Sequence, residues 1–409
     1  MGINKRMNSF KGSKIIIIFL LLIGVLICSC TSSVKHQRGV ISIPQALDNI
    51  KLMNVSEIAR SIRYIPLETN ENSLVGNISA LYCNEENIFI VDGANDIKIF
   101  DIKGRFIKKI NRIGRGPGEY YVPVYEISVV DEIILITTHY EIIEYDLDGN
   151  FIKRIGTPEI EGYGSGSPVK IDENHYVAGV HKYEGGAEYL AVVYDSLLNI
   201  RRMVPMEDIS KANKPDTPQL QNGTEDGTIV AMRRIKTPRM FQYGNRTRIS
   251  YPGMEEILSI DGSEAIDTAY VIDYDKYREP YDANSTFRDY YVNMAISFEV
   301  EDYLLFSATV GQVLNGSPTF VRAVYDKKTM ETTILYDNLD KREGFKDDIY
   351  GGPEFWPRNT SGKHSLISVQ QAISMISYAE ENSVSAELNK LISGLTENSN
   401  PVVIITELK

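Results

Sequence analysis

Cysteine is scarce in this chain, which has three in 409 residues. Cys28 and Cys30 follow an apolar N-terminal stretch, and Cys83 stands alone. A mature protein that begins at an acylated Cys30 has no second free thiol to pair with Cys83, so an intramolecular disulfide is excluded. Stability must then come from a hydrophobic core, and a chain of this length can build one.

The chain also lacks an apolar run long enough to be a transmembrane helix. Its longest run covers residues 15–27, thirteen residues, and reaches roughly 20 Å, against a hydrocarbon core of roughly 30 Å. Four basic and no acidic residues precede it, a pattern typical of a secretory signal peptide. We therefore predict that residues 1–29 are a signal peptide.

The residues that end this stretch, Ile27-Cys28-Ser29-Cys30, resemble the bacterial lipobox, in which an aliphatic and two small residues precede the lipidated cysteine. The resemblance implies a lipid anchor on Cys30 that binds a membrane, and several acyl chains anchor stably. We expect a place in the cell envelope, at the outer membrane. Residues 31–40 carry no carboxylate and leave the periplasmic and the surface face both open. The alternative is an ordinary signal peptide with a chance cysteine.

Positive charge is in the minority, with 43 Lys and Arg against 55 Asp and Glu. The net charge of −12 becomes −16 once the four basic residues of the signal peptide are removed. Binding to phosphates depends on clustered Lys and Arg, so nucleic acid is not expected as a partner.

Histidine is rare too, with five in the chain. His175 and His181 lie six apart around a strand-like run, a spacing that could place both on one face, and His139 is a third candidate. No spacing matches a known ligand motif, so we predict no metal site and no cofactor.

What the chain does have is an internal repeat. Residues 97–110 (IKIFDIKGRFIKKI) and 142–155 (IIEYDLDGNFIKRI) match at an offset of 45 at the glycine and at six of the seven apolar positions of the first copy. Each copy reads as two strands joined by a tight turn, in which Gly104 or Gly149 supplies a positive φ. Two further strand-like runs precede each copy. Four strands per unit is the count for one blade of a β-propeller.

Weaker copies continue along the chain. Each is marked by an apolar residue and an aspartate at the end of a strand: Phe100-Asp101, Tyr145-Asp146, Tyr194-Asp195, Ile260-Asp261 and Tyr325-Asp326. These five marks and the final strand 401–409 predict an all-β, six-bladed β-propeller over 59–409, closed by pairing 401–409 with 60–66. Residues 30–58 are expected to be a tether and lead-in, and 205–226 a loop. Apolar spacing over 372–393 predicts a helical insertion before the closing strand, preferred over a partner-binding helix.

From Gly114 the chain reads GRGPGEYYVPVYEISVV, which resembles the start of an NHL repeat. Together with PLETNENSLVGNI (66–78) and the C-terminal NPVVIITELK, it resembles the six-bladed β-propeller lipoproteins of Gram-negative bacteria of the gut. The resemblance spans residues 60–409 and is weakest between 200 and 360. It implies a fold and a location, and no activity.

Two segments contain candidate ligand contacts. In GRGPGEY (114–120) a strand follows the glycines, whereas a phosphate-binding loop needs a helix there. We therefore prefer the interpretation that Arg115 and Glu119 make the local contacts of a turn. The alternative is that they contact a ligand. The second segment holds the one tryptophan, Trp356, beside Glu354 and Arg358. Its ring could stack on a sugar or peptide, or fill a gap between blades.

The sequence favours a binding or scaffold module for a glycan, peptide or protein. It contains no nucleophile elbow, zinc-binding histidine pair or dinucleotide fingerprint, and no catalytic residue is assigned. The alternative is a hydrolase or lyase acting on carbohydrate or peptide at the central channel, with or without a divalent cation. That alternative rests on analogy with other propellers.

Overall fold

A computed structural model describes residues 39–182, 188–206, 238–251, 254–278, 291–311, 319–336 and 344–409. The signal peptide, Cys30 and residues 207–226 of the expected loop lie outside this part of the chain. The chain divides into the units Met1–Arg38 and Gly39–Lys409, of which the second is described below.

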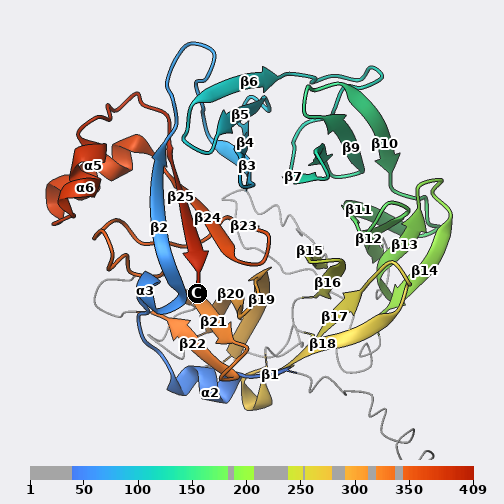
Figure 1. Ribbon diagram of the computed structural model, residues 1–409. Helices are drawn as coiled ribbons and strands as arrows, with labels where there is room; N and C mark the ends of the chain where they lie inside the picture. The colour runs from blue at the N-terminus through green and yellow to red at the C-terminus, as the bar shows by residue number, and fades with distance from the viewer. Residues whose placement is uncertain are drawn as a thin grey trace, which may run out of the picture. The chain divides into compact units, whose positions relative to one another are not determined.

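Within the unit Gly39–Lys409, six antiparallel sheets of four strands stand around a ring, with a parallel fifth strand on one of them (Figure 1). The predicted six-bladed β-propeller is thereby confirmed. Blades 1 to 3 consist of β3 (Ile78–Cys83), β4 (Asn87–Asp92), β5 (Ile97–Asp101) and β6 (Phe106–Ile110); β7 (Glu126–Val130), β8 (Ile133–Thr137), β9 (Glu141–Asp146) and β10 (Phe151–Gly156); and β11 (Tyr163–Lys170), β12 (His175–Lys182), β13 (Tyr189–Asp195) and β14 (Ile200–Pro205). Blades 4 to 6 consist of β15 (Arg239–Tyr243), β16 (Arg246–Ser250), β17 (Glu256–Ile260) and β18 (Ile266–Asp273); β19 (Tyr291–Glu299), β20 (Tyr303–Gly311), β21 (Thr319–Asp326) and β22 (Glu331–Leu335); and β23 (Asn359–Ser361), β24 (Ser365–Gln370), β25 (Val402–Leu408) and β2 (Ala59–Pro66).

The two repeat copies occupy equivalent places in neighbouring blades, as β5–β6 and β9–β10. Their turn glycines have the expected positive φ, +85° at Gly104 and +84° at Gly149. Both also pack against the outer strand of the preceding blade. A Cβ on Gly104 would collide with the Pro66 carbonyl, and one on Gly149 would lie 2.9 Å from Cγ1 of Ile110. Glycine is therefore required by the backbone conformation and by the close approach of two blades.

The five aspartate marks share one structural role, because four of them end the third strand of a blade and Asp261 directly follows it. Their carboxylates accept hydrogen bonds from the turn that follows, as Asp146 does from the backbone N–H and the side-chain amide of Asn150, both at 2.8 Å. These bonds lower the pKa of Asp146. Asp195 repeats the arrangement with Asn199. The mark recurs because an aspartate can cap this turn through its own side chain.

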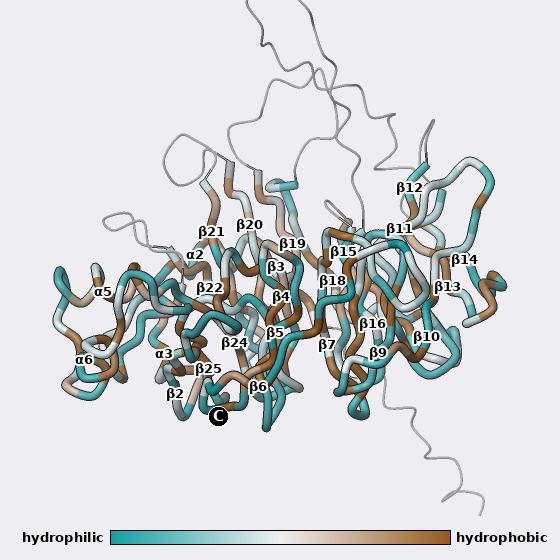
Figure 2. Tube along the Cα trace, turned by 90° about the horizontal axis from the view of Figure 1, so that it is seen from above, coloured by the Kyte–Doolittle hydropathy of each residue, from teal (hydrophilic) through white to brown (hydrophobic). Residues whose placement is uncertain are grey.

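The hydrophobic core consists of clusters shared by adjacent blades. On β13, Ala191 and Val193 belong to the cluster between blades 3 and 4, whereas Val192 and Tyr194 face blade 2. Successive side chains of a strand point to opposite faces, so a strand with a blade on each side is apolar at consecutive positions. This explains the unbroken apolar runs of the sequence, seen as brown stretches along the strands in Figure 2.

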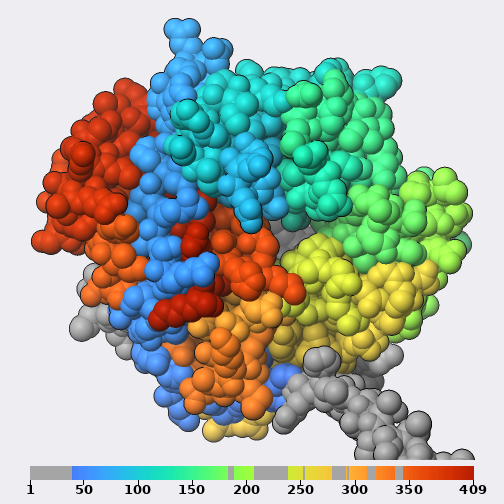
Figure 3. Space-filling model, in the orientation of Figure 1, coloured from blue at the N-terminus to red at the C-terminus, as the bar shows by residue number. Residues whose placement is uncertain are grey.

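The ring closes as predicted, because the C-terminal strand β25 pairs with the N-terminal strand β2. Their antiparallel register places Ile62 opposite Thr406 and Tyr64 opposite Ile404. Figure 3 shows the blue N-terminal and dark red C-terminal segments in contact. Blade 6 thus combines both ends of the propeller, and neither strand keeps a bare edge toward the other.

Residues 39–58, here called the strap, run along the outer edges of blades 4 and 5 before β2 begins. The strap contains β1 (Gly39–Ser42), which pairs in parallel with β18, and the short helices α2 (Ile43–Asp48) and α3 (Val55–Ile58). Ile50 then bridges to Ile334 of β22, and Asn54 bridges to Lys346. The strap therefore covers two outer edges that would otherwise be open to pairing.

The expected helical insertion lies between β24 and β25 as two helices, α5 (Ala372–Glu381) and α6 (Ala386–Ile392). The break has a local cause, since the Ser385 hydroxyl caps α6 by accepting a bond from the Leu388 N–H. Met375, Leu388 and Ile392 form a small cluster with Val402, against which Tyr64 packs. The insertion sits at the periphery of blade 6 (Figure 1). Among the described residues, no helix is long and apolar enough to cross a membrane.

Blades 4 and 5 are also joined by a buried charge cluster centred on Glu299. Its carboxylate lies 2.6 Å from Arg248 Nε and 2.8 Å from Lys327 Nζ, and it accepts a 2.8 Å hydrogen bond from the Tyr270 hydroxyl. The Glu299 side chain is fully buried, and that of Arg248 is 8% exposed. Removing one partner of such a cluster leaves the opposite charges buried and uncompensated.

We predict that Glu299→Gln lowers the free energy of unfolding by about 3–5 kcal/mol, because Arg248 and Lys327 lose their counter-charge in a buried position. Urea denaturation of residues 31–409 measures this value. The control is Glu301→Gln, whose side chain is 49% exposed and should cost less than about 1 kcal/mol. Equal losses in the two variants would contradict the prediction.

Candidate functional site

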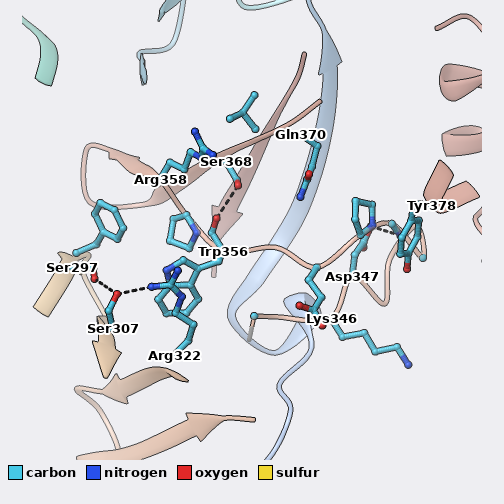
Figure 4. A pocket seen from close by; sticks show the side chains of 18 of the residues that line it. Ser297, Ser307, Arg322, Lys346, Asp347, Trp356, Arg358, Ser368, Gln370 and Tyr378 are labelled. Atoms are coloured by element: carbon cyan, nitrogen blue, oxygen red, sulfur yellow. Dashed lines mark hydrogen bonds between the residues drawn. The ribbon is translucent and has the colours of Figure 1, made fainter. Parts of the chain in front are cut away.

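A cavity of about 980 Å³ lies where blades 5 and 6 meet. One wall comes from β19, β20 and β21, and another from the connection 344–358, which leads from blade 5 into blade 6. The end of β24 and one side of α5 complete the lining. Figure 4 shows the side chains that project into this space. The site is thus assembled from segments far apart in the sequence.

Trp356 forms part of the wall and is held by three contacts. Its ring stacks on Phe345 with centroids 5.8 Å apart and planes 15° apart, and the Arg322 guanidinium lies 5.1 Å from its centroid. The Trp356 carbonyl accepts a 2.7 Å hydrogen bond from the Ser368 hydroxyl. The indole therefore lines the cavity and also packs between blades. Because Phe345 and Arg322 already pack against the ring, little of its flat surface is left for a sugar.

Arginines from three blades line the cavity: Arg239 at the start of β15, Arg322 on β21 and Arg358 just before β23. Arg322 is oriented by a 2.5 Å hydrogen bond to the Ser307 hydroxyl, which in turn contacts Ser297 at 3.0 Å. Arg358 is exposed, and its backbone N–H is fixed by the Ile367 carbonyl at 2.7 Å. Among the described residues, neither Arg239 nor Arg358 forms an ion pair.

Asp347 also lines the cavity, but its carboxylate is occupied. It accepts hydrogen bonds from the Tyr64 hydroxyl at 2.7 Å and from the backbone N–H groups of Ile349, Tyr350 and Gly352 at 2.9–3.0 Å. Burial, and then the Asp347 charge, raises the pKa of the Tyr64 hydroxyl. These bonds shape the connection 344–358 and leave Asp347 little capacity to bind anything else.

The strap holds the same connection from outside. The Val55 N–H donates to the Lys346 carbonyl at 2.8 Å, and the Lys346 N–H donates to the Met53 carbonyl at 2.9 Å. The Ser56 hydroxyl donates to Asp348 at 2.5 Å. The cavity wall therefore depends on residues that precede the first blade strand.

Of the five ligand contacts expected from sequence, the structure brings three together at the cavity: Trp356, Arg358 and Glu354. Arg115 and Glu119 lie in the connection between blades 1 and 2. There Glu119 accepts a 2.7 Å bond from the Gly116 N–H, and Arg115 lies 5.6 Å from the Tyr121 ring centroid. These are the local contacts of a turn, and neither residue lines the cavity.

Sequence reasoning missed Arg239, Arg322, Ser307 and Asp347. Each lies in or beside an ordinary strand or loop, and no local pattern distinguishes it from its neighbours. Only their proximity in the fold identifies them. Predicting that proximity requires the blade boundaries between residues 200 and 360. Those boundaries were the weakest part of the repeat.

The three candidate histidines do not all meet at one site, although His139 lies near His181. His175 contacts Asp172 at 2.9 Å in a turn of blade 3. Burial, and then the nearby His139, lowers the pKa of His181. Within the described ranges, no group of three or more His, Cys, Asp and Glu side chains is arranged to hold a metal ion.

Comparison with solved structures supports the fold. A protein of Bacteroides fragilis described as exported has a TM-score of 0.62 and 16% identity, covering 90% of this chain and 99% of its own. A member of the DUF4221 family from Bacteroides vulgatus gives 0.45 and 13%, covering 89% and 99%. Virginiamycin B lyase from Staphylococcus aureus gives 0.34 and 10%, covering 85% and 99%. At 16% identity, the likeness to the Bacteroides fragilis protein extends to the fold alone.

A comparison with curated proteins finds no match. A family model, described as a domain of unknown function, matches residues 38–407. That range includes the strap, all six blades and the helical insertion. The chain therefore belongs to the DUF4934 family.

Proposed function

We propose that this protein is a lipid-anchored binding module of the cell envelope, and that its ligand enters the cavity between blades 5 and 6. The observation that carries the proposal is the cavity itself. Its volume of about 980 Å³ is at the upper end of the range of small-molecule sites, about 300–1,000 Å³. Its walls are fixed by hydrogen bonds, so the space is formed before a ligand arrives.

The chemistry of the lining favours binding over turnover. The carboxylate of Asp347 is occupied by four donors and is poorly placed to move a proton. Besides Lys346, Asp347 and Glu354, the polar side chains of the lining carry mainly guanidinium, hydroxyl and amide groups, which bind polar ligands without reacting. No geometry among the described residues favours the hydrolase or lyase alternative.

A variant that fills the cavity tests this proposal. Gln370 lines the cavity, whereas Gln371, the next residue, is exposed and not part of the lining. Residues 31–409 are screened by thermal shift against neutral, amino and acidic oligosaccharides and short peptides. A ligand at a hundred times its Kd stabilises the protein by about 2.7 kcal/mol. We predict that at least one probe raises Tm, that Gln370→Trp abolishes the shift and that Gln371→Trp keeps it.

If no probe shifts Tm, or if Gln370→Trp and Gln371→Trp respond alike to every probe, the cavity is not a binding site. Unchanged Tm of both variants without ligand serves as the folding control.

The anchor is the second part of the proposal. It is supported by the signal-like N-terminus, the lipobox-like residues 27–30 and the description of the similar Bacteroides fragilis protein as exported. The NHL-like turn 114–120 agrees with the propeller lipoproteins that the sequence resembles. An outer-membrane position follows from the same resemblance.

We predict that Cys30→Ser shifts the protein from the membrane to the soluble fraction, because the acyl chains have no other attachment point. Cell fractionation and detection with an antibody against residues 39–409 measure the change. Cys28→Ser is the matched control and should stay with the membrane. Membrane retention of Cys30→Ser would rule out the anchor while leaving the binding proposal intact.

A further inference from the structure

We infer that the cavity between blades 5 and 6 selects an acidic oligosaccharide, one that carries carboxylates on successive sugar rings. The inference rests on the proposed binding function and adds the class of ligand. It follows from three features of the lining: arginines from three blades, an excess of basic over acidic residues, and a supply of neutral hydroxyl and amide groups.

The guanidinium groups are unusual for this chain, whose net charge is −12. Arg239, Arg322 and Arg358 come from blades 4, 5 and 6 and line one space. A guanidinium offers a planar fork of N–H donors that matches a carboxylate, and such charge-assisted pairs are the strong ones. The concentration of three in one cavity of an acidic protein favours an anionic ligand.

Basic residues outnumber acidic ones in the lining, with Arg239, Arg322, Lys346 and Arg358 against Asp347 and Glu354. The Asp347 carboxylate is already occupied. Its oxygens face the Tyr64 hydroxyl and three backbone N–H groups of the connection 344–358. Arg239 and Arg358 form no ion pair with a described residue, so no described carboxylate competes for them. Arg322 is held by Ser307 and by the ring of Trp356, which sets the direction of its guanidinium.

Neutral polar side chains fill much of the remaining wall. Ser297, Ser307, Gln370 and Asn382 carry hydroxyl or amide groups that donate and accept hydrogen bonds. Phe298 contributes an apolar surface beside them. Alternating hydroxyl-binding and apolar surface suits a sugar, which presents hydroxyl edges and C–H faces.

The spread of the charges argues against a peptide C-terminus, which brings a single carboxylate. Three guanidinium groups from three blades can engage more than one anion along a chain. An oligomer of sugar acids has such a repeat, and the cavity of about 980 Å³ is large enough for two or three rings.

Trigalacturonic acid is the probe, and its fully methyl-esterified form is the matched ligand, because esterification removes the charge and keeps the rings. Calorimetric titration of residues 31–409 should give binding of the acid that weakens as salt rises and at least about tenfold weaker binding of the ester. Arg358→Gln should weaken binding of the acid by about tenfold or more. Arg63→Gln, an equal change of charge at an exposed position on β2 outside the cavity, should leave the affinity unchanged.

Three results would overturn the inference. The acid and the ester could bind equally, or Arg358→Gln and Arg63→Gln could have equal effects. Alternatively, trialanine with a free carboxylate could bind where trigalacturonic acid does not, which would assign the cavity to a peptide end. In each of these cases, a probe whose binding is lost in Gln370→Trp would still support the proposed binding module. The proposed function itself fails only if no probe loses its binding in Gln370→Trp.

Discussion

The architecture depends on the backbone pairing of β2 with β25, the two strands that bring the ends of the propeller together in blade 6. Without this pairing, β2 and β25 would face solvent with unpaired N–H and C=O groups, and the blade 5/6 and blade 6/1 clusters would lose Ile62, Ile65, Val403 and Ile404. The clusters are shared by neighbours, so an opening at one joint removes the partner of the next blade. The shared core therefore depends on closure of the ring.

The cavity exists because one joint of the ring is built differently. Between blades 1 and 2 the connection packs tightly, with Tyr120 buried and its hydroxyl bonded to the Asn95 carbonyl at 2.6 Å. Between blades 5 and 6 the connection 344–358 lines the cavity and is held by Tyr64 and by the strap. The same blade-to-blade geometry thus gives a filled joint in one place and a hollow in another.

The fold could be predicted because its signals are local. The turn glycines Gly104 and Gly149, the aspartate caps and the apolar runs each act within one blade or against the next one, so a single copy reveals them. The strand 60–66 could be matched to 401–409 because a ring of blades leaves the first and last strands to pair. The break between α5 and α6 was missed, since the cap at Ser385 interrupts a helical pattern that continues on both sides.

The site could be predicted only in part, because its signals are not local. Trp356 was singled out as the one tryptophan, and Glu354 and Arg358 came with it as neighbours. Arg239 and Arg322 joined them through the curvature of the ring, and no spacing in the sequence records that curvature. Arg115 and Glu119 were suggested by a glycine-rich segment that resembles a binding loop, yet their partners are their own neighbours.

Adjacent carboxylates tie the strap region to the cavity wall: Asp347 accepts from Tyr64, and Asp348 from Ser56. Each acid is satisfied by a hydroxyl contributed from the opposite end of the sequence. Substitutions in the two regions are therefore expected to be coupled during evolution. An aspartate at 347 demands a donor at 64, and loss of either would select for repair in the other. Homologues of this chain are thus expected to conserve such pairs between 53–64 and 344–352.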